Sequence, residues 1–178
     1  MYNFYFQHDD FVVLSIPRCG SESLADGMHI YPLAAKAFAR VLVFVRDPIE
    51  RCISGYQFFQ PFPIDPRSAP TWEAWVDRIL DAPEGRDYAD QAKSAGRIVA
   101  ESRHLPVDPH WKPQAQLIDE APVAVTEVWA FEQLATVIPG IKHFHKSTVQ
   151  LVDRSYRSAE LLAYYARDTA LRLTAHGI

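Results

Sequence analysis

Two short apolar runs constrain the fold of this chain more than any other feature of its sequence. Phe11 to Ile16 and Val41 to Val45 are rich in β-branched residues and show no polar alternation. Such runs are typical of strands that are buried on both faces of a parallel sheet. Each run is followed by a loop that leads into helix-compatible sequence. The repeated order of strand, loop and helix predicts an α/β fold.

Later segments extend this pattern. Residues Ala121 to Trp129 are a third candidate for a buried strand, and helices are predicted after Thr71, over 87–102, and over Ser158 to His176. The apolar stripe of the helix after Thr71 consists of Trp72, Trp75, Val76, Ile79 and Leu80. The buried face predicted for the last helix consists of Leu161, Leu162, Tyr165 and Thr169. The whole predicts a three-layer sandwich around a central parallel sheet, with ligands bound beyond the carboxyl ends of the strands.

Composition limits the classes of partner. The chain has 178 residues, 48% of them hydrophobic, so we expect one domain over residues 1–178 with a sizeable core. The net charge of −4 argues against a broad basic surface and therefore against a nucleic-acid partner. No run approaches the ~20 apolar residues of a membrane span, and the first residues lack the pattern of a signal peptide. We therefore expect a soluble, cytoplasmic protein in which Cys19 and Cys52 are free thiols.

The first loop, in the sequence IPRCGSES, has the features of an anion site. Gly20 allows a close approach of the backbone to a ligand. The backbone N–H groups that follow it, with the hydroxyls of Ser21 and Ser23, would face an anion at a helix N-terminus, and Arg18 adds a positive charge. The loop lacks the Lys-Ser/Thr pair of the nucleoside-triphosphate motif. The alternative is a plain strand-to-helix turn with a serine cap.

A second candidate anion site, in VRDPIERCISGY, follows the second strand. Asp47 can cap a helix, and Ser54 falls about two turns along it. Arg46 from the strand end and Ser54 from the helix would then clamp one phosphate between them. The alternative is a capped helix with an ion pair between Arg51 and Asp47 at i,i+4 spacing.

Together, PRCGSES and VRDPIERCISGY resemble the two cofactor motifs of sulfotransferases that use 3'-phosphoadenosine-5'-phosphosulfate (PAPS). They are most similar to the carbohydrate branch, which includes membrane-type and bacterial enzymes. In that family the first loop holds the 5'-phosphosulfate, and the arginine of Arg-Asp-Pro with a serine eight residues later holds the 3'-phosphate, a spacing that Arg46 and Ser54 share. Less specific matches cover most of the remaining chain, in TWEAWV, DPHWKPQ, VTEVWAFEQL and YRSAELLAYYARD.

The resemblance implies a P-loop NTPase-like sulfotransferase fold. It also implies transfer of a sulfuryl group from PAPS to a hydroxyl of a carbohydrate or small-molecule acceptor, without a metal. The cofactor-binding residues that it implies are Arg18, Cys19, Gly20, Ser21, Glu22, Ser23, Arg46 and Ser54. Arg18 and the loop amides would also stabilise the leaving phosphate.

Departures from the family pattern leave other functions open. Relatives have lysine in the place of Arg18 and threonine in the place of Glu22, and arginine cannot donate a proton to the leaving group as lysine can. The stretch from Leu24 to Val41 is short, so the acceptor pocket would be reduced or supplied by residues 60–113. The alternatives are a non-catalytic module that binds a nucleotide or the desulfated cofactor, and a nucleotide-dependent phosphoryl transferase.

Sulfuryl transfer to a hydroxyl also needs a base. His29, in MHIYP, is the first choice because relatives place a similar histidine segment before the second motif, and His110, in DPHWKPQ, is the second. The alternatives are an ordinary loop histidine at His29, and a loop fixed by packing of Trp111 at His110. His143 and His145 would share one side of a strand, but two ligands without a third make a weak metal site.

Overall fold

The computed structural model describes residues 5–7, 10–21, 23–24, 29–31, 38–62, 65, 68–81, 110–141 and 152–177. Within this part of the chain, five strands form a single sheet in the order β3-β1-β2-β4-β5. The strands are β1 (Tyr5–Gln7), β2 (Val12–Leu14), β3 (His29–Tyr31), β4 (Val41–Val45) and β5 (Glu127–Ala130). The two apolar runs of the sequence thus form neighbouring strands near the centre of the sheet.

The sheet is mostly parallel, with one reversed strand. β2, β4 and β5 pair in parallel, whereas β1 is antiparallel to both β2 and β3. The α/β fold and the parallel pairing of the central strands are therefore confirmed, whereas β1, which the sequence pattern did not predict, runs antiparallel to its neighbours. Only residues 8–11 separate β1 from β2, and so short a connection can join only antiparallel neighbours.

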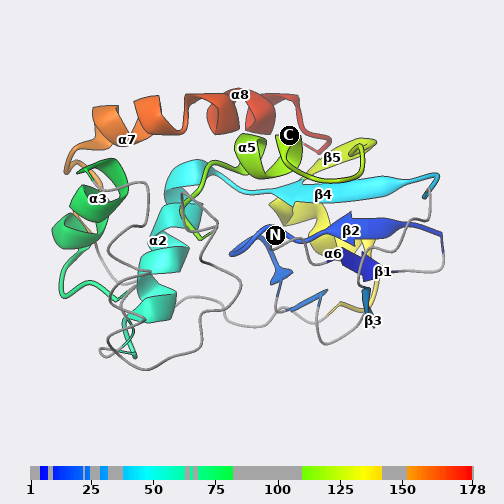
Figure 1. The fold of residues 1–178 in the computed structure, drawn as a ribbon, viewed down its shortest axis with the longest axis horizontal. Helices are drawn as coiled ribbons and strands as arrows, with labels where there is room; N and C mark the ends of the chain where they lie inside the picture. Colours follow the sequence, from blue (N-terminus) through cyan, green and yellow to red (C-terminus); the bar gives the residue numbers. More distant parts are fainter. Residues whose placement is uncertain are drawn as a thin grey trace.

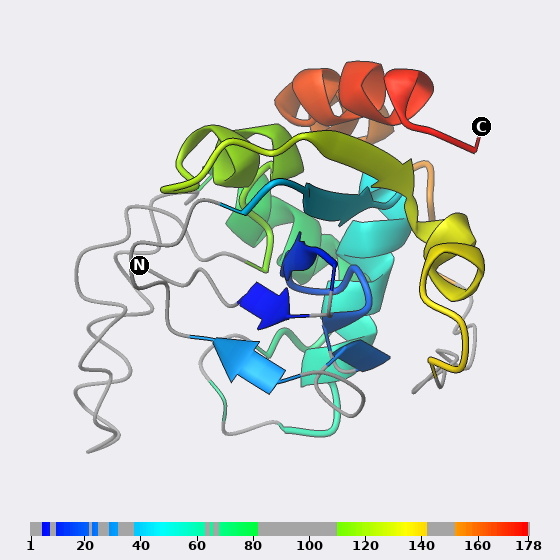
Figure 2. The same ribbon diagram turned by 90° about the vertical axis from the view of Figure 1, so that its right-hand side faces the viewer.

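Both faces of the central strands are buried, because successive side chains point to opposite sides. On one face, Val12, Leu14 and the odd-numbered valines of β4 pack with residues of α5 (Gln114–Asp119) and α8 (Ala166–Thr174). On the other face, Val13, Leu42 and Phe44 pack with residues of η2 (Phe131–Gln133) and α6 (Leu134–Val137). Figure 2 shows α8 and α6 on different sides of the strands.

A second core lies beside the sheet and consists of helices. It joins α2 (Pro48–Phe59), α3 (Trp72–Asp81) and α7 (Ser158–Tyr164), which gather at one end of the molecule in Figure 1. Trp72, Trp75, Val76 and Ile79 of α3 are buried in it, as the apolar stripe predicts, and Leu80 packs against it partly buried. The hydroxyl of Thr71 accepts a hydrogen bond from the N–H of Ala74 at 3.2 Å, which confirms the predicted cap.

The predicted final helix is two helices. α7 and α8 meet at Tyr165, whose backbone (φ −99°, ψ 22°) is not helical. Leu161 and Tyr165 are buried as predicted, but Leu162 is 46% exposed. Since Leu162 is about 100° around the helix from Leu161, the two cannot share one narrow buried face.

Several predicted features lie outside the described residues. They are the helix over 87–102, the segment 142–151 with His143 and His145, and Glu22. None of the described helices has the length and apolar character that a membrane crossing requires.

The cap of α2 provides a test of the fold. The Oδ1 atom of Asp47 accepts hydrogen bonds from the N–H groups of Ile49 (3.0 Å) and Glu50 (2.9 Å). We expect Asp47→Ala to lower the free energy of unfolding by about 1 kcal/mol, and Asp47→Asn to retain most of it, because asparagine caps equally well. Urea denaturation followed by circular dichroism measures both. Equal losses in the two variants would show that the cap is not what Asp47 contributes.

Candidate anion-binding site

Two loops leave the carboxyl ends of neighbouring parallel strands and therefore emerge side by side. Leu14 of β2 is in register with Val43 of β4, so the loop after Ile16 and the loop at Arg46 lie at the same edge of the sheet. Ligand sites of α/β proteins lie at this edge. The register of β2 with β4 therefore brings the two loops together.

The first loop is a tight turn over residues 17–20. Arg18 (φ +66°) and Gly20 (φ +84°) both have left-handed backbone conformations, and the N–H of Cys19 donates to the carbonyl of Ile16 at 3.0 Å. A Cβ atom at Gly20 would lie 2.7 Å from Cδ2 of Leu134. The positive φ and the packing against α6 therefore both require glycine at this position.

The side chain of Arg18 reaches across to α2. Its Nε and Nη2 atoms donate to the hydroxyl of Ser54 at 3.3 and 3.2 Å, and its guanidinium lies 4.3 Å from the centroid of the Phe58 ring. Ser54 and Phe58 are one turn apart on the same face of the helix. The structure therefore joins one residue of the first loop to the serine predicted for the second anion site.

Arg46 has a different neighbourhood. Its guanidinium lies 5.3 Å from the centroid of the Phe131 ring, which also flanks Gly20. Within the described residues, no hydrogen bond joins the Arg46 side chain to Ser54. The clamp of Arg46 and Ser54 on one phosphate therefore stays a prediction. Arg18 and Arg46 thus contact different aromatic rings, Phe58 and Phe131.

The side-chain amide of Gln114 forms hydrogen bonds with both loops. Its Oε1 atom accepts hydrogen bonds from the N–H of Arg46 (2.9 Å) and the Sγ of Cys19 (3.1 Å), and its Nε2 atom donates to the carbonyl of Arg46 (2.8 Å). Gln114 is fully buried. The amide thus satisfies both backbone groups of Arg46, as a neighbouring strand would, and holds the first loop to the second.

Gln114 is itself held by Asp168 of α8. Gln114 and Ala115 are the first two residues of α5. The buried carboxylate accepts a hydrogen bond from the N–H group of each, at 2.8 Å. A carboxylate at this end of a helix satisfies donors that have no partner within the helix. Asp168 therefore fixes the position of the helix that presents Gln114.

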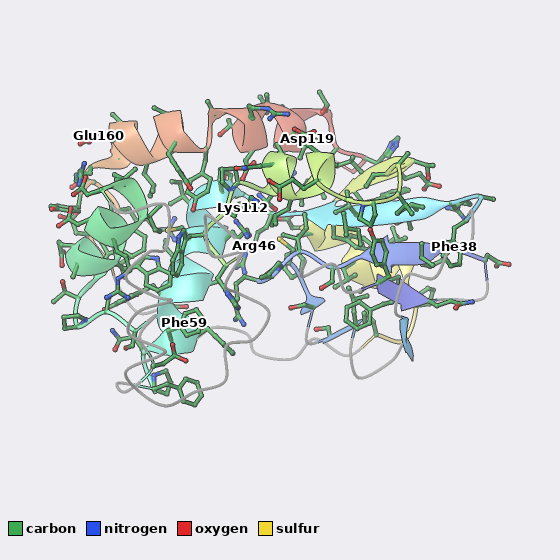
Figure 3. All side chains as sticks on the ribbon, in the orientation of Figure 1. Phe38, Arg46, Phe59, Lys112, Asp119 and Glu160 are labelled. Carbon is green, nitrogen blue, oxygen red and sulfur yellow. The ribbon has the colours of Figure 1, made fainter. Side chains whose placement is uncertain are left out.

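Arg51 links the same segments through backbone carbonyls. It is 1% exposed, and it donates to the carbonyl of Pro17 from Nε (3.0 Å) and to that of Lys112 from Nη1 (2.9 Å). Its side chain thus faces the first loop and the segment before α5. The sequence pattern had paired it with Asp47 instead. Figure 3 labels Arg46 and Lys112 in this central region, between α2 and the strands.

Burial governs the ionisation of the groups around this junction. Burial raises the pKa of the Cys19 thiol, although the positive charges of Arg51 and Arg46 act in the opposite direction. Burial also raises the pKa of Tyr165 well above its usual value, so the neutral hydroxyl donates to the carbonyl of Trp111 at 2.7 Å. The guanidinium groups of Arg51 and Arg46 therefore place positive charge near Cys19 in the first loop, although the net charge of the chain is negative.

The two candidate bases lie in different places. His29 is in register with Gln7, which is in register with Val12 at the amino end of β2. The first loop begins after Ile16, at the other end of β2. Ile16 is four residues from Val12, which is ~13 Å at about 3.3 Å per residue. The backbone register therefore separates His29 from both loops, and this geometry gives no support to its predicted role as base.

His110 lies beside α2. Its ring stacks on Phe58 with centroids 6.4 Å apart and meets Phe59 edge-on at 5.0 Å. Because the Arg18 guanidinium also lies over the Phe58 ring, His110 is the candidate base that the fold brings to the site. Among the other predicted loop residues, Ser21 is partly buried and Ser23 is buried.

Sequence reasoning missed three buried polar residues: Gln114, Arg51 and Asp168. Gln114 and Asp168 lie within segments that carry the family resemblance, but local pattern does not distinguish a buried polar side chain from an exposed one. Arg51 carried a usable signal. It lies three residues after Pro48 and four before Gly55, which are also buried, and a buried arginine needs acceptors.

Comparisons of the chain with protein-family models, with curated proteins and with solved structures found no match. Within the described residues, no group of three or more His, Cys, Asp or Glu side chains is arranged to hold a metal ion.

The Gln114 junction makes a stability prediction. Gln114→Ala leaves the N–H of Arg46 without its acceptor and removes a fully buried side chain, and we expect it to lower the free energy of unfolding by ~2 kcal/mol or more. Gln116→Ala is the matched control, because Gln116 is on the same helix and its side chain donates to the exposed Glu120. We expect that change to cost less than ~0.5 kcal/mol. Chemical denaturation compares the two, and similar costs would contradict the importance of the junction.

The thiols make a second prediction. Cys19 and Cys52 are buried, and burial raises the pKa of Cys52 to about 12. Since the thiolate is the nucleophile, we expect neither to react with Ellman's reagent in the native protein at pH 8, and both to react in 6 M guanidinium chloride, about two thiols per chain. Rapid reaction of Cys19 in the native state would show that the first loop opens.

Proposed function

We propose that this protein is a PAPS-dependent sulfotransferase that transfers a sulfuryl group to a hydroxyl of a carbohydrate or small-molecule acceptor. The observation that carries the proposal is the meeting of the two candidate cofactor loops at the carboxyl edge of the sheet, with Arg18 in contact with Ser54. A nucleotide with phosphates at both ends needs two such anion sites close together. The resemblance of both motifs to the family's cofactor motifs supports the same ligand.

The charge at this edge supports an anionic ligand. Arg18 belongs to the first loop, Arg46 is joined to that loop through Gln114, and Arg51 donates to the carbonyl of Pro17 in it. In an in-line transfer, fixed guanidinium groups and loop amides would stabilise the charge that develops on the leaving phosphate. His110 would remove the proton of the acceptor hydroxyl, since its ring stacks on Phe58, over which the Arg18 guanidinium also lies.

A module that binds the nucleotide without turnover is the second candidate. Arginine in the place of the family's lysine keeps the charge but does not supply a proton to the leaving group. In addition, the ring of His110 is packed against both Phe58 and Phe59, an arrangement that suits a structural role. Binding and turnover therefore need separate measurements.

Calorimetry without magnesium tests the ligand. We expect adenosine 3',5'-bisphosphate to bind at least about tenfold more tightly than ADP or ATP, because only it places phosphates on both sites. Arg46→Ala should weaken that binding about tenfold or more, because it removes a charged partner of a phosphate. Arg40→Ala is the matched control, since Arg40 lies at the amino end of β4 and pairs with Glu127.

Equal affinity for the three nucleotides, or absent binding, would contradict the proposal. Tight binding of the bisphosphate together with no transfer from PAPS to a panel of sugars and small hydroxyl compounds would select the binding module. A preference for ATP with magnesium would select a phosphoryl transferase.

A further inference from the structure

The ring of Phe58 contacts two residues that belong to different loops. The guanidinium of Arg18, in the first loop, lies over this ring, 4.3 Å from its centroid. The imidazole of His110, in the segment before α5, lies nearly parallel to the same ring, with 6.4 Å between the centroids and 11° between the planes. Phe58 therefore joins the two side chains that the proposed function places at the leaving phosphate and at the acceptor hydroxyl.

Helix α2 gives the Phe58 ring a fixed position. The helix is packed on α3 by two aromatic contacts, each with 5.8 Å between the ring centroids, which join Tyr56 to Trp72 and Phe59 to Trp75. Phe58 is partly buried and packs against the same helical core. A side chain on a packed helix holds its neighbours more precisely than a side chain on a loop does.

Arg18 needs such a support because its own backbone is strained. Its φ of +66° lies in the left-handed region, which residues other than glycine rarely adopt. The hydroxyl of Ser54 accepts hydrogen bonds from its side chain at 3.3 and 3.2 Å, which are longer than the ~2.9 Å usual for N–H···O bonds. The electron-rich face of Phe58 attracts the same cation, so it adds a support that these long hydrogen bonds do not supply.

His110 is supported by the same ring. The backbone of the two residues that follow it is already held, because their carbonyls accept hydrogen bonds from buried side chains. The imidazole itself is packed by aromatic rings, stacking on Phe58 and meeting Phe59 edge-on at 5.0 Å and 76°. The direction in which its nitrogens point therefore depends on these two rings.

We propose that Phe58 is a positioning residue of the site, whose ring fixes the Arg18 guanidinium and the His110 imidazole relative to α2 and to each other. Phe58 then acts through these two side chains. Small displacements of groups that bind or react with a ligand cost much of their effect. The ligand is the cofactor of the proposed function, so the expected effect on binding rests on that function.

Nuclear magnetic relaxation in the ligand-free protein measures the positioning directly. We expect Phe58→Leu to lower the order parameters of the Nε–H bond of Arg18 and of the Cδ2–H bond of His110, because the ring face is lost. Replacement of Phe58 by pentafluorophenylalanine keeps the shape of the ring and reverses the charge of its face. This second variant retains the packing of α2 and should release Arg18 in the same way.

Phe62→Leu is the matched control. It makes the same change at a ring that neighbours Phe58, with 6.1 Å between the centroids, and that is 51% exposed. We expect it to leave both order parameters unchanged. Equal decreases in Phe62→Leu and Phe58→Leu, or no decrease in Phe58→Leu, would overturn the positioning role.

A double-mutant cycle tests whether Phe58 acts on the ligand through Arg18. In calorimetry with adenosine 3',5'-bisphosphate, we expect Phe58→Leu to weaken binding about fivefold in the wild-type background. In the Arg18→Gln background the same change should weaken binding less than about twofold, because the side chain that it positions is gone. An equal loss in both backgrounds would show a merely structural effect of Phe58 and would overturn the proposal.

The two kinds of measurement separate this inference from the proposed function. If the wild-type protein does not bind the bisphosphate, the proposed function fails and the order parameters decide the inference. Their decrease in Phe58→Leu then supports the positioning role, and unchanged values overturn it. If the wild-type protein binds the bisphosphate and Phe58→Leu binds it equally well, the proposed function stands and the inference is wrong.

Discussion

The pairing of a buried side-chain amide with the backbone at the end of β4 is the interaction on which the rest of the site depends. Gln114 satisfies the N–H and the carbonyl of Arg46 and accepts from Cys19, while Asp168 satisfies the first donors of α5. Buried polar groups are costly when unpaired and cooperative when paired. The network therefore favours one relative position of both loops, α5 and α8, at the place where the sheet ends.

Arg51 extends this constraint to the other side of the first loop. A buried guanidinium that donates to two carbonyls, of Pro17 and Lys112, sets the distance between the segments that carry them. The same group contributes positive charge beneath the loop without being exposed to solvent. A chain with a net charge of −4 can thus carry a local site for anions, because field strength depends on where charges lie and not on their sum.

Helix α2 connects this site to the second core. Its Ser54 faces Arg18, whereas Tyr56 and Phe59 pack with the tryptophans of α3. A Cβ at Gly55 would lie 3.1 Å from Trp75, so the glycine lets α3 approach closely beside the site serine. Substitutions in the helical core should therefore move Ser54 as well as alter the stability of the protein, because α2 contributes residues both to that core and to the site.

Local pattern in the sequence was enough to determine the two apolar strands, the capped start of α2, the buried stripe of α3 and the meeting of two loops at one edge. Each depends on neighbours within a few residues or on the rule that parallel strands end together. The tertiary structure alone decided that β1 is antiparallel, that His29 lies at the far end of the sheet, that Arg18 rather than Arg46 contacts Ser54, and that Gln114 closes the junction. The physical reason is that these pairings join residues far apart in the chain, whose meeting depends on how the elements pack and leaves no periodic signal in the sequence.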